Sequence, residues 1–412
     1  MSNTETLSGK KTVIAFNVYF SPNSFGGGTI VAEEVAKQLL MNECCEIRLI
    51  FVTVFQSNEY EPYSQVRYVS KGIDVIAINI PENISYIDTY RHDRVAYLVD
   101  DIVRQYQPEV AHIHCIQNIG ASFIDVLEHN SVKILVSIHD CWWLADNQFL
   151  LNKEGKYCFQ GKLTDALQYE FTHEPAAAFK RLEYLSLQLS KVDKYLFPSE
   201  FQQNLHIENG FDPDKCFVNM NGVSLPLPGF MKKKSTDCKV RFGFVGGPGP
   251  LKGSELIRQS FESLTDDANN KYELHLVDSA RNINRSWSRD YETWNVNGVC
   301  RIVDGYTQDS IDEFFSNIDV LLFPSLCKES FGLTVREALV RNVWVIATDG
   351  GGTAEQIVEG VNGNIIPISI DSSFLREKIV RCMNRDWSNY VNPLANEVSG
   401  YKKQARELVT LL

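Results

Sequence analysis

The sequence predicts an α/β protein with two domains, each a doubly wound parallel sheet covered by helices. The chain has 412 residues, whereas a single domain usually holds about 100 to 200. Short apolar runs alternate with amphipathic stretches, and this alternation occurs twice along the chain. A segment in which Gly, Pro and Asn cluster separates the two series, as expected for a connector between domains.

The first series of apolar runs predicts a domain over residues 1–205. Its runs are rich in Val, Ile and Phe, which is typical of strands that are buried on both faces. The stretches between them, such as 31–40 and 94–106, carry apolar residues at helical spacing. The predicted strands lie within residues 11–20, 46–55, 74–80, 109–115, 133–140 and 194–199.

The second series predicts a domain over residues 236–390, with residues 206–235 as the connector. A break near Asn392-Pro393 separates it from residues 391–412, because proline interrupts helical structure. We expect this tail to form a last helix that packs back on the first domain. The predicted strands lie within residues 240–247, 272–278, 298–306, 318–325 and 343–349.

Composition and charge exclude several classes of protein. Hydrophobic residues make up 44% of the chain and charged residues 22%, which is not the composition of a disordered protein. The 40 basic and 52 acidic side chains give a formal net charge of −12, which argues against a nucleic-acid partner. Ten cysteines are scattered without a CxxC spacing, so we expect reduced thiols and no metal site.

The stretch MSNTETLSGKK lacks the apolar core of a signal peptide, and no apolar run approaches the roughly 18 residues that span a bilayer. We therefore expect a cytoplasmic protein.

Residues 178–191 allow two interpretations. Lys180, Arg181 and Lys191 alternate with leucines and aromatic residues, which fits peripheral contact with the inner face of the cell membrane. A helix that faces the core explains the same pattern.

The segment FPSLCKESFGLTVREALV, residues 323–340, is the strongest candidate for a binding site. A strand ends, a polar loop carries Glu329, and the following helix carries Glu337 about one turn inside. Parallel α/β sheets bind ligands at such strand ends, and each carboxylate accepts hydrogen bonds from two hydroxyl groups. An alternative makes both glutamates surface acids, one capping the helix and the other pairing with Arg336 or Arg341.

The start of the same helix is a candidate anion site. Phe331 and Gly332 lead into the helix, so the first backbone amides, those of Leu333 and Thr334, have no partner within it. Free amides and the helix dipole favour a bound anion. We therefore expect these residues to contact a diphosphate.

A glycine-rich turn follows the first predicted strand of the second domain. The segment FGFVGGPGPLKG carries Gly247 in the turn and Lys252 at the start of a helix. A lysine at this place reaches a phosphate as a point charge. The order of residues required for a Walker loop is absent, so the turn by itself is weak support for phosphate binding.

Three further strand ends carry candidate residues. Gly27 and Gly28 follow the first strand and permit close approach of a ligand to a helix N-terminus, although such glycines also serve packing. His139 and Asp140 end another strand and are expected to face the ligand. His114 ends a third strand and is a weaker candidate for contact with an acceptor.

Together these segments resemble retaining GT-B glycosyltransferases, especially glycosyltransferase family 4. The family carries two glutamates with seven residues between them, as at Glu329 and Glu337, and commonly reads V-G-R-x-x-x-x-K-G around the lysine that matches Lys252. Gly247 stands where that family often has the arginine. Residues 195–205, 219–225 and 348–367 extend the resemblance over almost the whole chain.

The resemblance implies a GT-B fold, with two Rossmann-like domains facing each other across a cleft. It implies transfer of a hexosyl group, with retention, from a nucleotide diphosphate sugar of the UDP or GDP type to a hydroxyl of a glycan or lipid-linked acceptor. Neither a metal nor another cofactor is implied, and the usual setting is bacterial surface polysaccharide synthesis, of O-antigen or capsule. The implied catalytic residues are Glu329, His139 and Lys252, while Glu337 holds the ribose.

Two alternatives to transfer stay open at this point. A GT-B nucleotide-sugar epimerase has the same pair of domains and releases a new sugar without an acceptor. A catalytically silent subunit of a polysaccharide assembly complex binds the sugar nucleotide only. The intact Glu329, Glu337 and Lys252 argue against a silent subunit, whereas the missing arginine at position 247 favours it slightly.

Overall fold

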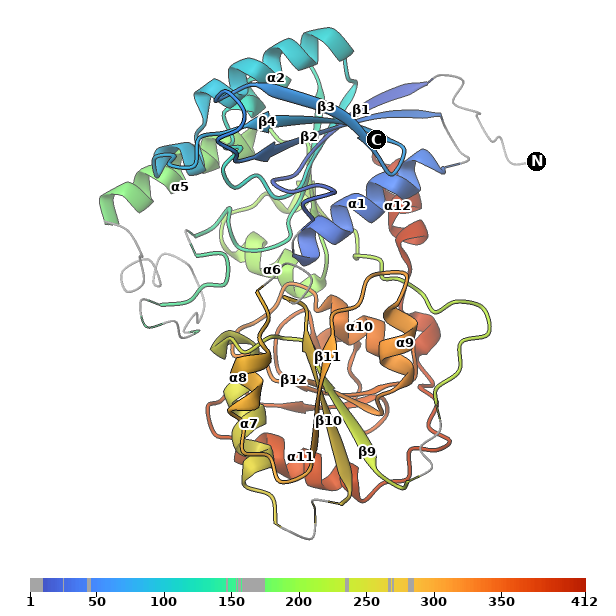
Figure 1. Ribbon diagram of the computed structural model, residues 1–412. Helices are drawn as coiled ribbons and strands as arrows, with labels where there is room; N and C mark the ends of the chain where they lie inside the picture. Colours follow the sequence, from blue (N-terminus) through green and yellow to red (C-terminus); the bar gives the residue numbers. More distant parts are fainter. Residues whose placement is uncertain are drawn as a thin grey trace, which may run out of the picture. The chain divides into compact units, whose positions relative to one another are not determined.

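The computed structural model describes residues 10–24, 26–42, 46–145, 147–152, 154, 157, 175–233, 237–265, 268, 270–280 and 285–412. The chain divides into two compact units, each with its own sheet (Figure 1). The predicted architecture of two parallel-sheet α/β domains is thereby confirmed. Unit 1 comprises Met1–Gln148, Gln160–Gly222 and Tyr401–Leu412, and unit 2 comprises Phe149–Phe159 and Val223–Gly400.

Within the described residues, the sheet of unit 1 has eight strands: β1 (Lys11–Phe16), β2 (Ile47–Phe55), β3 (Gln65–Ser70), β4 (Ile73–Asn79), β5 (Val110–Ile113), β6 (Lys133–Ser137), β7 (Lys194–Phe197) and β8 (Cys216–Val218). Their order across the sheet is β3-β4-β2-β1-β5-β6-β7-β8. Every neighbouring pair is parallel except β3 with β4. The strand order therefore reverses between β1 and β5, which makes this place the topological switch point of unit 1.

The helices of unit 1 flank this sheet on both faces (Figure 1). They are α1 (Gly27–Leu40), α2 (Asp93–Tyr106), α3 (Phe123–His129), α5 (Pro175–Ser190), α6 (Glu200–Glu208) and α12 (Tyr401–Val409), with 3-10 helices η1 (Ile87–Thr89) and η2 (Pro213–Lys215). Helices α1 and α12 pack against each other, as do α2 and α3. The carboxyl-terminal helix α12 thus belongs to unit 1 although it is last in the chain.

Within the described residues, the sheet of unit 2 has six strands: β9 (Val240–Phe244), β10 (Tyr272–Asp278), β11 (Val299–Asp304), β12 (Val320–Phe323), β13 (Trp344–Thr348) and β14 (Gly363–Ile366). Their order is β11-β10-β9-β12-β13-β14, and all neighbouring pairs are parallel. Every residue of β10 is buried, as expected for a strand covered on both faces. The order reverses between β9 and β12, which is the switch point of unit 2.

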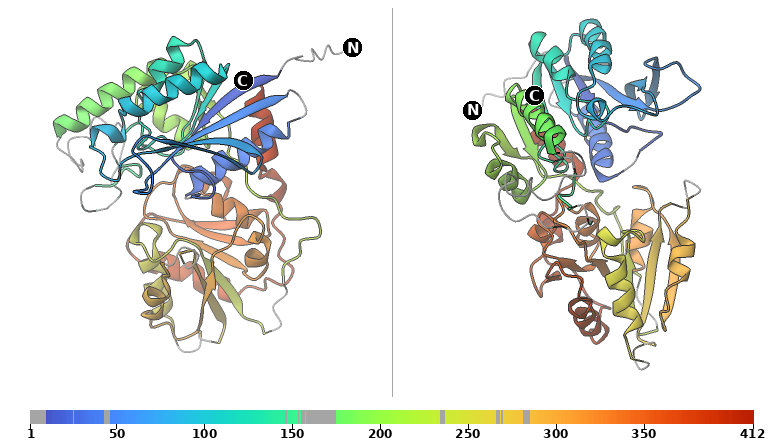
Figure 2. Two further views of the ribbon diagram at one scale, coloured as in Figure 1. Left: turned by 45° about the horizontal axis from the view of Figure 1, so that its top comes forward. Right: turned by 90° about the vertical axis from the view of Figure 1, so that its left-hand side faces the viewer.

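The helices of unit 2 cover its sheet (Figure 2). They are α7 (Ser254–Glu262), α8 (Ser288–Glu292), α9 (Ile311–Ser316), α10 (Leu333–Leu339) and α11 (Ser373–Met383), with 3-10 helices η3 (Pro250–Lys252), η6 (Ala354–Gln356) and η7 (Ala395–Glu397). Helices α7 and α11 pack against each other. Their apolar sides join the central strands in a core that contains Phe242, Ile257, Leu322 and Ile379. This packing fixes the strand ends that carry the candidate site.

Three strands lie outside the predicted runs. Strand β3 pairs antiparallel with β4 at the edge of the first sheet, where exposed and half-buried side chains alternate. Strand β8 falls in the stretch expected to connect the domains, and it pairs with β7 of unit 1. Strand β14 extends the second sheet beyond β13. Each is short or partly polar, so none forms a long apolar run.

Residues 178–191 fold mostly into α5, whose buried side chains show that it faces the core of unit 1. Ala178, Leu185 and Leu189 are buried, as is Arg181, whose guanidinium donates to the carbonyl of Trp142 at 2.6 Å. The interpretation of Arg181 as part of a basic membrane-facing surface is therefore wrong. Among the helices of the described residues, none has the length and apolar character to cross a membrane.

His206 on α6 shows how burial in unit 1 controls protonation. Its ring is fully buried beside Phe197 and Phe211. Its Nδ1–H donates to the carbonyl of Gln202 at 2.8 Å, and its Nε2 has no hydrogen-bond partner within the described residues. Burial lowers the pKa of His206 to about 4. In the unfolded chain the pKa of a histidine is about 6.5. The contribution of the neutral His206 ring to stability is fully present at pH values above 6.5, and it is lost as the pH falls toward the pKa of about 4 in the folded protein.

We predict that the free energy of unfolding falls by up to about 2 kcal/mol between pH 7 and pH 5 because of His206 alone. His206→Gln should remove that part of the pH dependence, whatever the substitution costs at pH 7. Urea unfolding of both proteins at the two pH values measures the difference. An equal pH dependence in the wild type and the variant contradicts the assignment.

Candidate functional site

Lys252 and Glu329 meet at the switch point of unit 2. Lys252 ends η3 in the loop after β9, and Glu329 lies in the loop after β12, so the two loops follow the strands where the order reverses. The Lys252 Nζ lies 2.6 Å from the Glu329 Oε1. Their side chains are 33% and 14% exposed, so the pair is partly shielded from water. The structure thus brings together two of the residues that the sequence predicts as catalytic.

The loops that carry this pair are packed directly against each other. The amide of Leu326 donates to the carbonyl of Leu251 at 2.8 Å. Gly253 has φ +75°, and a Cβ at this position would lie 2.0 Å from the carbonyl oxygen of Pro324. Only glycine combines this backbone conformation with so close an approach. The contact holds Lys252 against the loop of Glu329.

Glu337 occupies a different environment, because it is buried on the inner side of α10. It is 4% exposed, and burial raises the pKa of its carboxyl to about 7, against the opposing effects of Arg341 and of a hydrogen bond from Gln308. Arg341 itself pairs through Nε with Asp312 at 2.6 Å. The interpretation of Glu337 as a surface acid is therefore excluded. A buried carboxyl with a strongly shifted pKa is typical of a functional group.

The residues at the start of α10 are held by their surroundings. Gly332 has φ +77°, and a Cβ there would lie 2.6 Å from the Thr353 Oγ1. The Phe331 side chain is 2% exposed and lies under the Arg336 guanidinium, which donates to the Phe331 carbonyl. Leu333 and Thr334 are the first two residues of the helix. Phe331 is therefore buried, with its carbonyl already engaged by Arg336.

The structure explains why glycine stands at position 247. Its φ is +74°, and a Cβ would lie 3.0 Å from the ring of Trp287. Asp278 fixes this tryptophan by accepting its backbone amide at 2.9 Å and the Ser286 hydroxyl at 2.6 Å. An arginine at 247 would need this left-handed backbone conformation and a small shift of the indole. Both the backbone conformation and the contact with Trp287 therefore favour glycine at this position.

In unit 1, the candidate residues gather at its own switch point. His114 follows β5 and His139 follows β6, and the His114 Nδ1 lies 2.9 Å from the His139 Nε2. A Cβ on Gly28 of α1 would lie 3.3 Å from the His139 Cγ and 3.0 Å from the Cys115 Sγ. Burial lowers the pKa of His139 to about 4 and that of His114 well below its usual value. The two rings are therefore neutral at pH 7.

Asp140 and Gly27 complete the predicted set in unit 1. Burial raises the pKa of Asp140 to about 6, although the Trp142 amide, Arg181 and the Gln117 side chain oppose the shift. Gly27 is the first residue of α1 and is exposed. No group of three or more His, Cys, Asp or Glu side chains suited to hold a metal occurs among the described residues.

The sequence alone did not indicate several neighbours of these residues. Tyr306 is hydrogen-bonded to Thr334, and its pKa is raised well above the usual value by burial and then by Glu337. Gln308 lies by Glu337, and its buried Oε1 has no hydrogen-bond partner within the described residues. Both residues follow β11, and their position after a predicted strand is the one feature of the sequence that could have indicated a place near the site. Trp287, against Gly247, had no such signal.

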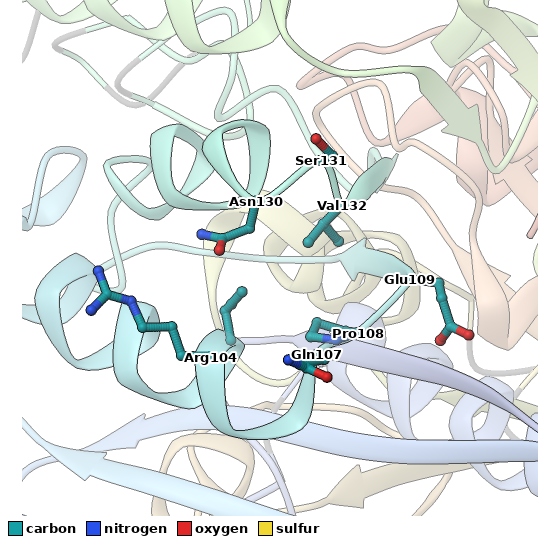
Figure 3. Close-up of a pocket in the computed structure, with 8 residues that line it drawn as sticks. Arg104, Gln107, Pro108, Glu109, Asn130, Ser131 and Val132 are labelled. Atoms are coloured by element: carbon teal, nitrogen blue, oxygen red, sulfur yellow. The ribbon is translucent and has the colours of Figure 1, made fainter.

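Unit 1 contains a pocket of about 510 Å³. Figure 3 shows residues that line it. The pocket is lined by Val103, Arg104, Gln107, Pro108, Glu109, Asn130, Ser131 and Val132. Six of these residues, 107–109 and 130–132, lie in the segments directly before β5 and β6, so the pocket lies at the amino ends of those strands. The candidate residues follow the carboxyl ends, where doubly wound sheets bind ligands. We therefore do not assign the pocket to the functional site.

Two protein families match the two halves of the chain. Residues 25–226 match Glycosyltransferase Family 4, and residues 230–403 match Glycosyl transferases group 1. Each unit has a parallel sheet with a topological switch point, the place where such sheets bind ligands. This two-domain α/β architecture is that of the GT-B class. The chain belongs to the glycosyltransferases of family 4 and group 1, which confirms the family predicted from the sequence.

Similar proteins support the fold at low sequence identity. A glycosyltransferase from Rickettsia africae is 16% identical with a TM-score of 0.67, covering 98% of this chain and 97% of that one. HepE from Anabaena, solved with UDP and glucose, is 13% identical with a TM-score of 0.64, covering 97% of this chain and 98% of that one.

A curated relative matches over a shorter region. A lipopolysaccharide 1,2-N-acetylglucosaminetransferase from Salmonella typhimurium is 25% identical over 162 residues, which are 39% of this chain. The match spans about a third, 34%, of the relative's length. The relative's activity is therefore considered below only as support for a proposal.

We predict that Gly253→Ala destabilises the protein more than Gly360→Ala does. Both glycines have φ near +76°, but a Cβ at Gly360 meets nothing within 4 Å, so it isolates the cost of the backbone conformation. That cost is about 1 kcal/mol, and the clash with Pro324 should add about 1 to 3 kcal/mol. Thermal and urea unfolding measure both variants. Equal losses contradict the close approach of the two loops.

Proposed function

We propose that the protein is a retaining hexosyltransferase. It moves a hexosyl group from a nucleotide diphosphate sugar to a hydroxyl of a glycan or lipid-linked acceptor. The observation that carries the proposal is the Lys252–Glu329 pair at the switch point of unit 2, in the half of the chain that matches Glycosyl transferases group 1. Both matched families and the curated relative are transferases by name, which favours transfer over the epimerase and the silent subunit.

The roles proposed for the pair follow from their charges. Lys252 places a cation where negative charge develops on the departing diphosphate, and a fixed charge is most effective there. Glu329 accepts hydrogen bonds from sugar hydroxyls and stabilises the positive charge at the anomeric carbon. The departing phosphate takes the proton of the acceptor hydroxyl on the same face of the sugar. This route retains the anomeric configuration and needs neither a side-chain nucleophile nor a metal.

The remaining residues hold the rest of the donor in this proposal. Glu337 accepts the ribose hydroxyls, and the amides of Leu333 and Thr334 contact the diphosphate. We keep His139 as a residue that contacts the sugar, because its neutral ring can accept or donate a single hydrogen bond. We keep Gly27, Gly28 and Gly247 as backbone contacts, and Asp140 and His114 as residues on the acceptor side.

The names of similar proteins support the donor and the product that we propose. HepE binds UDP in its solved complex, so UDP is the nucleotide we propose, with GDP as the second choice. The Salmonella relative acts on lipopolysaccharide by name, and we propose surface polysaccharide, lipopolysaccharide or capsule, as the product.

We predict that UDP sugars raise the melting temperature of the wild type in a screen against UDP, GDP, dTDP and ADP sugars, because binding stabilises the native state. Lys252→Ala should weaken UDP binding about 10- to 100-fold, since a charge-assisted contact contributes about 1.5 to 3 kcal/mol. Lys271→Ala, an exposed lysine of the same unit, is the control. No stabilisation by any nucleotide sugar contradicts the proposed function.

We predict that UDP affinity rises between pH 6 and pH 8. The Glu337 carboxyl, with its pKa near 7, must lose its proton to accept both ribose hydroxyls. Each pKa unit by which binding lowers that value changes affinity about tenfold across this range. Isothermal titration of Glu337→Gln should give weaker binding without this pH dependence, whereas Glu377→Gln, at an exposed position of α11, should retain it. If the UDP affinity of Glu337→Gln still rises between pH 6 and pH 8, the assignment of Glu337 to the ribose is wrong.

A further inference from the structure

Ser325 lies between the end of β12 and Glu329, and its hydroxyl is directed at that carboxylate. The side chain is 1% exposed, and its Oγ donates to the Glu329 Oε1 at 2.7 Å. The other acceptors near the hydroxyl are more distant, the Leu251 carbonyl at 3.4 Å and the Cys327 Sγ at 3.5 Å. A hydroxyl has one proton to donate, so the short contact to Glu329 takes it.

The same carboxylate oxygen also faces Lys252. The Nζ lies 2.6 Å from Oε1, so Oε1 has two donors. Within the part of the chain that the structure describes, Oε2 accepts no hydrogen bond and makes no ion pair. The two oxygens of Glu329 are therefore not equivalent. One is committed to the protein and the other is left for a ligand.

The main chain around Glu329 is fixed as well. Its amide donates to the Gly350 carbonyl at 2.8 Å, and its carbonyl accepts from the Gly352 amide at 3.0 Å. The Ser325 carbonyl accepts from the Thr348 hydroxyl at 2.6 Å. Backbone and one carboxylate oxygen are thus held from three sides. This arrangement determines the direction in which Oε2 points.

We propose that Ser325 is a positioning residue for the donor sugar. It holds Oε1 of Glu329 beside Lys252, so that Oε2 is presented to a hydroxyl of the sugar. Without Ser325, Lys252 alone holds the carboxylate, which can rotate and offer either oxygen to the ammonium group. The sugar then loses an oriented acceptor, while Lys252 still meets the diphosphate. The inference rests on the proposed function and deepens it, because it concerns the sugar part of the donor.

The test compares binding of UDP with binding of UDP-glucose and UDP-N-acetylglucosamine by isothermal titration. Ser325→Ala should lower the affinity for whichever UDP sugar the wild type binds by at least fivefold. The affinity for UDP should stay within twofold of the wild-type value. Ser325→Thr, which keeps the hydroxyl, should restore sugar binding to within twofold of the wild type. Ser260→Ala, a fully buried serine of α7 in the same unit, is the matched control and should change neither affinity.

A double-mutant cycle tests whether Ser325 acts through Glu329. In the Glu329→Gln background, Ser325→Ala should have no further effect on the UDP sugar. An independent effect in that background, or equal weakening of UDP and UDP sugar by Ser325→Ala, overturns the inference. Ser325→Cys keeps the volume with a weaker donor and replaces the alanine variant if that variant fails to fold.

The outcomes separate this inference from the proposed function. A wild type that binds neither UDP nor either sugar contradicts the proposed function and removes the donor that Ser325 is inferred to serve. A wild type that binds the sugar, with a Ser325→Ala variant that behaves like Ser260→Ala, leaves the proposed function intact and rejects the positioning role alone.

Discussion

The ion pair between Lys252 and Glu329 is the interaction on which the candidate site depends. It joins the loops after β9 and β12, the two strands at which the order of the second sheet reverses. Its geometry depends on Gly253, which alone permits the approach to Pro324. Separating the loops would leave a partly buried carboxylate without its cation, which is costly. The same contact therefore stabilises unit 2 and, in the proposed function, holds Lys252 where the diphosphate binds.

Two carboxylates of one unit have been given different properties by their surroundings. Glu329 is engaged by a cation and a hydroxyl, whereas Glu337 is buried with a pKa raised to about 7. In the proposed function these different surroundings suit different tasks, charge stabilisation for Glu329 and hydroxyl recognition for Glu337. Unit 1 shows a related use of burial, since His114 and His139 share a hydrogen bond as neutral rings.

The sequence predicted the long buried strands and the Lys252 and Glu329 loops, because apolar runs and glycine-rich turns carry local signals. Strands β3, β8 and β14 gave no such signal, since they are short or partly polar and form through pairing with a neighbour. The burial of Arg181 and the contact of Trp287 with Gly247 depend on residues distant in the sequence. Such tertiary packing has no periodicity that a single sequence reveals.

The most direct measurement is a crystal structure of the protein with UDP bound. The account predicts that the β-phosphate lies within hydrogen-bonding distance of the Lys252 Nζ, with the ribose hydroxyls on Glu337 and the Glu329 Oε2 open toward the place of the sugar. A nucleotide bound elsewhere, with the Lys252–Glu329 pair undisturbed and remote from the phosphates, would contradict the assignment of the switch point of unit 2 as the donor site.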